Sequence, residues 1–215
     1  MRPFIRTIET LELDGGALCL NFVNSVRNRF ENPLFEFIVT PEDWILWNRR
    51  VQHFNEVAVQ DLRKYSYENQ GIAIIELRRI IKVREMLYRI FRNIAHKELP
   101  LNEDIRIFNK ECSFAFRYLN IKINDKLESS VRWSYERSDL LRVLLPIIKS
   151  AYELLISDTM ERIKECSNCG WLYLDQSKNN CRIWCNMKTC GNSMKIKKYY
   201  EKKKVLLNKP WGRDL

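Results

Sequence analysis

The 215-residue chain has few of the residues on which common catalytic sites depend. It holds only two histidines, His53 and His96, and both fall inside helical patterns where a packing role is expected. It has no glycine-rich phosphate loop and no H-E-x-x-H motif, which are the signatures of nucleotide-binding loops and of one class of zinc protease. No set of residues suggests a catalytic site, and we expect no enzymatic activity.

The sequence also lacks long apolar runs and flexible linkers. The longest apolar stretch, residues 16–23, is far too short to span a bilayer, and the first ten residues lack the apolar core of a signal peptide. No Gly/Ser-rich linker, low-complexity tract or internal repeat is visible. We therefore expect a cytoplasmic protein with no membrane partner. In that reducing compartment, seven cysteines favour metal ligation or buried thiols over disulfides.

Positive charge is concentrated at one end of the chain. The formal net charge is +10, from 37 basic and 27 acidic residues. Residues 160–215 contain 13 of the basic and 5 of the acidic residues, so this segment carries +8 and residues 1–159 carry only +2. Such an asymmetry favours a polyanionic partner, most often a nucleic acid.

Hydrophobic periodicity predicts a mainly helical body, and an apolar content of 46% is enough to build its core. The clearest start signal is the run from Thr40 to Asp43, in which Thr40 can cap, Pro41 suits the first turn and Asp43 can complete a capping box. Asn102 and Ser138 are further cap candidates. The expected elements are an edge strand or extended arm over 3–14, helices over 17–26, from 41 to about 58, over 72–97, from 102 and over 139–157, and a small β-hairpin over 121–135.

Four cysteines are spaced as a metal site requires. Cys166 and Cys169 form one close pair, and Cys185 and Cys190 form a second pair after fifteen intervening residues. Two such pairs predict a tetrahedral site that holds one structural Zn²⁺ per chain, because four protein thiolates leave no open position. An iron–sulfur cluster is the alternative for this ligand type. Cys181 could also replace Cys185 as a ligand.

The residues in and around these cysteines resemble the CGNR zinc-finger family, in which a helical ABATE domain precedes a four-cysteine finger. The matching segments are C-S-N-C-G-W at 166–171, W-C at 184–185, C-G-N at 190–192, L-N-F-V-N-S at 20–25, T-P-E-D at 40–43 and V-R-E-M-L-Y-R at 83–89. The resemblance implies that Cys185, not Cys181, is the ligand. Ser193 stands where the family has arginine, Asn21 stands where it has aspartate, and Cys181 is an additional thiol.

The resemblance also implies the overall organisation. We expect a mainly α chain with a helical ABATE-like domain at 1–158 that includes the small hairpin. A small treble-clef-like finger with a basic C-terminal helix should follow at 159–207, and residues 208–215 form a tail. From the residues of the C-terminal helix itself, Met194, Ile196 and Tyr199 or Tyr200 could pack back.

The family is described as bacterial, stress-linked transcription regulators, and the basic end of the chain agrees with a DNA-binding role. The candidate nucleic-acid-binding residues are Arg182, Lys188, Asn192, Lys195, Lys197, Lys198 and Lys202. Double-stranded DNA is the first hypothesis for the partner, and an RNA- or ribosome-associated role is the second. In the third hypothesis the helical domain binds a small molecule near Asn24, Arg84 and Asn109, and the finger docks a protein. A homodimer and a small-molecule effector are left open.

Overall fold

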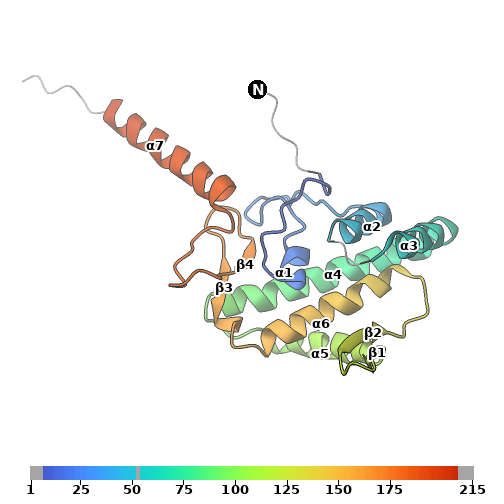
Figure 1. Cartoon of the computed structure of the whole chain (residues 1–215). Helices are drawn as coiled ribbons and strands as arrows, with labels where there is room; N and C mark the ends of the chain where they lie inside the picture. Colours follow the sequence, from blue (N-terminus) through green and yellow to red (C-terminus); the bar gives the residue numbers. More distant parts are fainter. Residues whose placement is uncertain (1–6, 52–53, 208–215) are drawn as a thin grey trace, which may run out of the picture.

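The computed structural model describes residues 7–51 and 54–207, so His53 and the predicted tail at 208–215 lie outside the described residues. Within these ranges the chain forms seven α-helices and two small antiparallel sheets (Figure 1). The mainly α fold class is thereby confirmed. The longest helix, α4 (Gln70–Ala95), runs through the centre of the helical body, and its predicted span differs by only two residues at each end.

The start of α2 (Pro41–Arg50) has the predicted capping box. The Asp43 amide donates to Thr40 Oγ1 at 3.1 Å, and the Thr40 amide donates to Asp43 Oδ2 at 2.7 Å. The predicted continuation to residue 58 is wrong, because α2 ends at Arg50 and a separate helix, α3 (Glu56–Glu68), follows. Asn55 gives the physical reason, since its side chain accepts from the Ala58 amide and starts the new helix.

Two other N-terminal predictions need correction. The described part of the 3–14 arm, residues 7–14, forms turns and irregular chain rather than a strand. The following helix, α1 (Leu18–Val23), is shorter than predicted, because the chain leaves helical geometry and Val26 forms an isolated antiparallel bridge with Glu36.

The second half of the body follows the predicted order. Helix α5 (Asn102–Phe116) begins where expected, although Leu101 occupies the cap position and Asn102 does not cap it. The hairpin pairs β1 (Leu119–Ile123) with β2 (Ser129–Trp133). A short 3₁₀ turn, η1 (Leu140–Val143), precedes α6 (Leu144–Leu155). Asp139 occupies the cap position of η1 and Val143 that of α6, so the predicted cap Ser138 holds neither position. Pro146 lies in the first turn of α6, where its missing N–H is tolerated.

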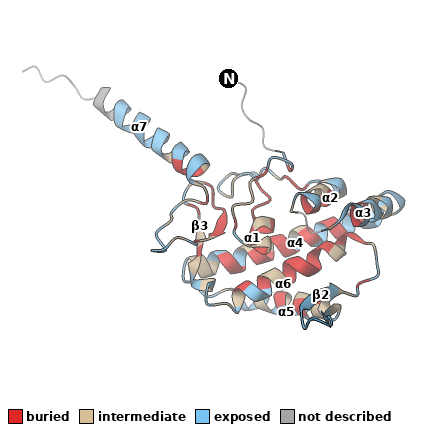
Figure 2. Cartoon of the chain, viewed as in Figure 1, coloured by how far each residue is buried: buried red, intermediate tan, exposed pale blue. Residues whose placement is uncertain are grey.

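Aromatic side chains of α1 and α2 fill the core beside α4. Trp44 and Trp47 stack with ring centroids 5.3 Å apart, and Phe22 contacts both rings at 5.2 and 5.5 Å. The indole N–H of Trp44 donates to the Leu140 carbonyl at 3.1 Å, which joins α2 to η1. Figure 2 shows the buried residues of α1, α4 and α6 facing this interior.

The C-terminal part begins with the 3₁₀ turn η2 (Met160–Arg162), followed by β3 (Ile163–Glu165) and β4 (Leu172–Leu174), which pair antiparallel. A π-helical turn, η3 (Met187–Gly191), leads directly into α7 (Asn192–Leu207). Helix α7 points away from the helical body (Figure 1). In the described part of the chain, no helix is both long enough and apolar enough to span a membrane.

The prediction that α7 packs back is wrong for three of its four residues, while Met194 is half-buried. Ile196, Tyr199 and Tyr200 are 57–63% exposed, and Figure 2 shows an almost entirely exposed helix. The physical reason is the direction of the chain after Cys190, which carries α7 outward and leaves these side chains without a surface to cover.

Candidate metal centre and nucleic-acid interface

The four predicted cysteines come together in one buried cluster. Cys166 and Cys169 lie in the turn between β3 and β4, whereas Cys185 and Cys190 come from the long loop after β4 and from η3. All four sulfur atoms lie within 4.8 Å of one another, and the Cys169–Cys185 and Cys185–Cys190 Sγ distances are both 3.7 Å. A tetrahedron with Zn–S bonds of about 2.3 Å has edges of about 3.8 Å, so the donor set fits Zn²⁺. Cys181 is exposed and is not part of the cluster.

The close packing of the four thiols favours the binding of a cation between them. Hydrogen bonds from Cys169, Cys185 and Cys190 lower the pKa of Cys166 far below its usual range, so one thiolate forms readily. The interaction with Cys166 in turn raises the pKa of Cys169 and of Cys185, because a second thiolate would face the first. A divalent cation removes this repulsion and permits all four sulfurs to ionise.

The first cysteine pair sits on a tight turn that needs glycine. Gly170 has φ +69°, and a Cβ at this position would lie 2.6 Å from the Arg29 Cβ. The turn is closed by hydrogen bonds from the Gly170 amide to the Cys166 carbonyl (2.9 Å) and from the Cys166 amide to the Trp171 carbonyl (2.8 Å). Glycine is thus required here for both its backbone conformation and the close approach of the helical body.

Asp175 organises the loop that carries the second cysteine pair. Its fully buried carboxylate accepts hydrogen bonds from the Ser177 amide (2.9 Å), the Arg182 amide (2.9 Å) and the Lys164 ammonium (2.8 Å). Burial opposes its ionisation, but the hydrogen bonds from Lys164 and Ser177 outweigh burial and hold the pKa of Asp175 well below its usual range. The loop therefore folds around a permanent negative charge.

The Arg182 side chain, a predicted nucleic-acid contact, is used inside the finger. Its guanidinium donates to the Trp184 carbonyl at 3.0 Å and to the Cys185 carbonyl, and it lies over the Tyr173 ring at 4.7 Å. These bonds hold the backbone beside a metal-ligating cysteine. A contact between Arg182 and a nucleic acid stays a prediction.

The finger is docked onto the helical body by backbone groups and by Asn24. The Asn24 amide donates to the Leu172 carbonyl at 2.7 Å and accepts from the Leu172 amide at 2.9 Å, so the side chain pairs with β4 as a neighbouring strand would. The Trp171 indole donates to the Val26 carbonyl, and the Arg29 amide donates to the Cys169 carbonyl, both at 2.8 Å. Asn24 was predicted to line a ligand pocket, but both polar atoms of its side chain form hydrogen bonds between the body and the finger.

A second contact with the finger, made by α4, was not predicted from the sequence. Glu165, which precedes the first metal ligand, accepts a hydrogen bond from the Tyr88 hydroxyl at 2.8 Å. His96 Nε2 lies 2.6 Å from its carboxylate, and Arg92 forms an ion pair with it at 3.4 Å. The three partners recur along one side of α4 at intervals of four residues, a spacing that places them on one helix face. That spacing is the only pattern that could have pointed to a shared partner.

The other two predicted pocket residues lie in different surroundings. Arg84 is fully buried and forms ion pairs with Glu36 and Glu85 at 2.7 and 2.8 Å. Asn109 is exposed on α5 and lines a surface pocket of about 430 Å³ to which neither Asn24 nor Arg84 contributes.

The predicted nucleic-acid-binding residues other than Arg182 are exposed at the outer end of the molecule. Lys188 belongs to η3, and the Asn192 side chain donates to its carbonyl at 3.1 Å, which links η3 to the start of α7. The lysines of α7 are all in solvent; they are Lys195, Lys197, Lys198, Lys202, Lys203 and Lys204. Ser193 is also exposed at the first turn of this helix.

We expect Asn24→Ala to destabilise the protein by about 2–4 kcal/mol, because the amide and carbonyl of Leu172 would both stay buried without a partner. Urea unfolding of the metal-loaded protein measures this change. Asn120→Ala, which removes an exposed amide from β1, is the matched control and should change stability by less than about 0.5 kcal/mol. Equal stabilities for the two variants would contradict the role of Asn24.

Two family models match the chain. The ABATE model, described as “Putative stress-induced transcription regulator”, matches residues 16–158. The CGNR zinc finger model matches residues 162–203, which include all four clustered cysteines and most of α7. The comparison with curated proteins finds no match.

Proposed function

Because the chain belongs to the ABATE family and carries a CGNR zinc finger, we propose that it is a DNA-binding transcriptional regulator of the cytoplasm. In this proposal one structural Zn²⁺ per chain is held by Cys166, Cys169, Cys185 and Cys190. Four thiolates leave no open coordination position, so the metal stabilises the finger and takes no part in catalysis. The helical domain serves as the regulatory part, and the chain has no enzymatic role.

The observation that supports DNA as the partner is the exposure and direction of α7. The helix has 16 residues and is therefore about 24 Å long, and it stands clear of the body (Figure 1). By helical spacing, Lys195, Lys198 and Lys202 share one side. A helix with one lysine-lined side can enter the major groove, which is about 12 Å wide, or lie along the phosphates.

The composition of this helix indicates how it would bind. Lysines make point-charge contacts with phosphates and discriminate poorly between bases, whereas arginine is the usual reader of guanine. Ser193 stands where the family has arginine, and Arg182 is engaged within the finger. We therefore expect affinity that comes mainly from the DNA backbone, with a modest sequence preference.

A salt series with duplex DNA tests the proposal. Binding of the metal-loaded protein, followed by fluorescence anisotropy, should weaken steeply as salt rises. Replacing Lys195, Lys198 and Lys202 with glutamine should reduce the slope of log K against log salt by roughly 0.9 for each lost phosphate contact. The matched triple variant at Lys64, Lys110 and Lys126, which are exposed lysines of the body, should keep the original slope. Absence of binding at low salt, or a flat salt dependence, would overturn the proposal.

A second candidate partner is RNA with unpaired bases, and the exposed tyrosines favour it. Tyr199 and Tyr200 lie among the lysines of α7, and aromatic rings beside positive charge can stack on unstacked bases. Competition between unlabelled duplex DNA and a stem-loop RNA separates the two candidates. Stronger competition by the RNA, reduced by Tyr199→Ala together with Tyr200→Ala, would favour this alternative over DNA.

A further inference from the structure

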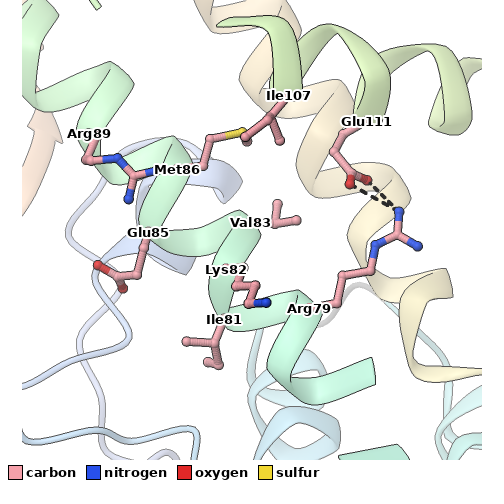
Figure 3. A pocket seen from close by; sticks show the side chains of 9 residues that line it. All are labelled: Arg79, Ile81, Lys82, Val83, Glu85, Met86, Arg89, Ile107 and Glu111. Carbon is pink, nitrogen blue, oxygen red and sulfur yellow. Dashed lines mark hydrogen bonds and ion pairs between the residues drawn. The ribbon is translucent and has the colours of Figure 1, made fainter. Parts of the chain in front are cut away.

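A groove between α4 and α5, far along the chain from the cysteine cluster, has the features of a small-molecule site (Figure 3). Its volume is about 450 Å³, within the range of about 300–1,000 Å³ that is usual for ligand pockets. Val83 and Met86 of α4 are buried in its floor, and Ile107 of α5 faces them across the groove. The floor is therefore apolar and is built from two helices of the folded body.

Most charged groups on the rim are already neutralised by partners. Arg79 donates to both carboxylate oxygens of Glu111 at 3.1 and 3.0 Å (Figure 3). Arg89 forms a two-point ion pair with Asp104 at 2.9 and 2.6 Å.

Glu85 is also neutralised, since it accepts from Arg29 and Arg84 at 2.7 and 2.8 Å. Lys82 differs from all of these, because its ammonium has no hydrogen bond or ion pair with any residue that the structure describes. The groove thus offers one uncompensated positive charge beside an apolar floor.

We infer that this groove binds a small amphipathic organic monoanion, such as a carboxylate with an aliphatic or aromatic body. The apolar body would cover Val83, Met86 and Ile107, and the carboxylate would pair with Lys82. A neutral molecule would gain nothing from the positive charge of Lys82, and a cation would be repelled by it. The inference concerns the helical body alone and does not depend on DNA binding, so either can fail without the other.

Octanoate is a suitable probe, since it has a single carboxylate and a flexible apolar chain. Titration into the ¹⁵N-labelled, metal-loaded protein should shift the amide resonances of Lys82, Met86 and Ile107, with a Kd on the order of 1 mM for so few atoms. Octanamide and octylammonium, which have the same chain length, should bind at least roughly fivefold more weakly, because only the carboxylate can pair with Lys82.

Two variants locate the binding. Lys82→Glu should weaken octanoate at least roughly fivefold, because it reverses the one unpaired charge of the groove. Lys64→Glu, which changes the net charge equally but lies on α3 away from the groove, should leave the affinity unchanged. Ile107→Trp fills the groove and should also abolish the resonance shifts, while an unchanged melting temperature shows that each variant is folded.

Three results would overturn the inference. The first is the absence of octanoate-induced shifts at the groove at concentrations well above the expected Kd. The second is equal affinity for octanoate and octanamide, which would remove the role assigned to the charge. The third is unchanged octanoate binding by both Lys82→Glu and Ile107→Trp, which would place the binding elsewhere.

Discussion

Removal of the metal is expected to unfold the finger over residues 163–191 and to free α7 from its fixed direction, while the helical body stays folded. Without a cation, the buried sulfurs of Cys166, Cys169, Cys185 and Cys190 cannot all be thiolates at contact distance. In zinc-finger peptides, metal binding contributes about 10–16 kcal/mol to folding at neutral pH. Hydrogen exchange measured before and after chelation should show loss of protection in the finger and retained protection in α4.

Single substitutions test the same prediction without a chelator. Cys185→Ser should lose the metal and the protection of the finger, since serine does not supply the fourth thiolate. Cys181→Ser is a close control, because it removes a neighbouring thiol that is exposed and lies outside the cluster. It should keep about one zinc per chain by elemental mass spectrometry. Less than about half an equivalent of zinc in fresh protein, or a visible iron–sulfur absorption, would contradict the zinc assignment.

The parts of the structure that could be predicted are those with local signals. The start of α2 depends on Thr40 and Asp43, which are three residues apart, and the capping box formed as expected. The metal site depends on two cysteine pairs whose spacing is set by tetrahedral geometry, and all four cysteines met in one cluster. In both cases the interaction is encoded by a short pattern of residue types, so one sequence is sufficient to find it.

The parts that could not be predicted depend on which distant surfaces meet. Asn24 pairs with Leu172 across 148 residues, and Glu165 meets His96 across 69 residues. A polar residue in an apolar helix predicts some buried hydrogen bond but does not identify its partner. The same limit explains the error over α7, whose Ile196, Tyr199 and Tyr200 suggest a packed face although the fold provides no surface opposite them.

The buried ion pairs of Arg84 lead to the second large expected effect. The side chain is fully buried and donates to Glu36 at two points, both 2.7 Å, to Glu85 at 2.8 Å and to Ser25 at 3.2 Å. Arg84→Met keeps much of the side-chain volume, but it removes one positively charged partner from each of the Glu36 and Glu85 carboxylates. Removing one member of a buried pair costs about 3–5 kcal/mol, and the partial exposure of both glutamates places the expected loss near 3 kcal/mol.

The loss of stability in Arg84→Met should depend on pH in a defined direction. Burial favours the protonated form of Glu85, but the charges of Arg29 and Arg84 outweigh burial and lower its pKa in the folded protein. Its stabilising contribution is therefore present above the unfolded pKa of about 4.5 and is lost as pH falls through the lower folded value. The difference in unfolding free energy between wild type and Arg84→Met should be largest near neutral pH and should narrow on acidification.

Urea unfolding of both proteins at neutral and acidic pH measures this dependence. Arg49→Met is the matched control, since its ion pair with Glu56 at 3.1 Å is exposed and should contribute less than about 1 kcal/mol. A loss near zero for Arg84→Met at neutral pH would mean that the buried pairs only balance their own desolvation. A difference that widens as the pH falls would contradict the assignment of Glu85 as an ionised partner.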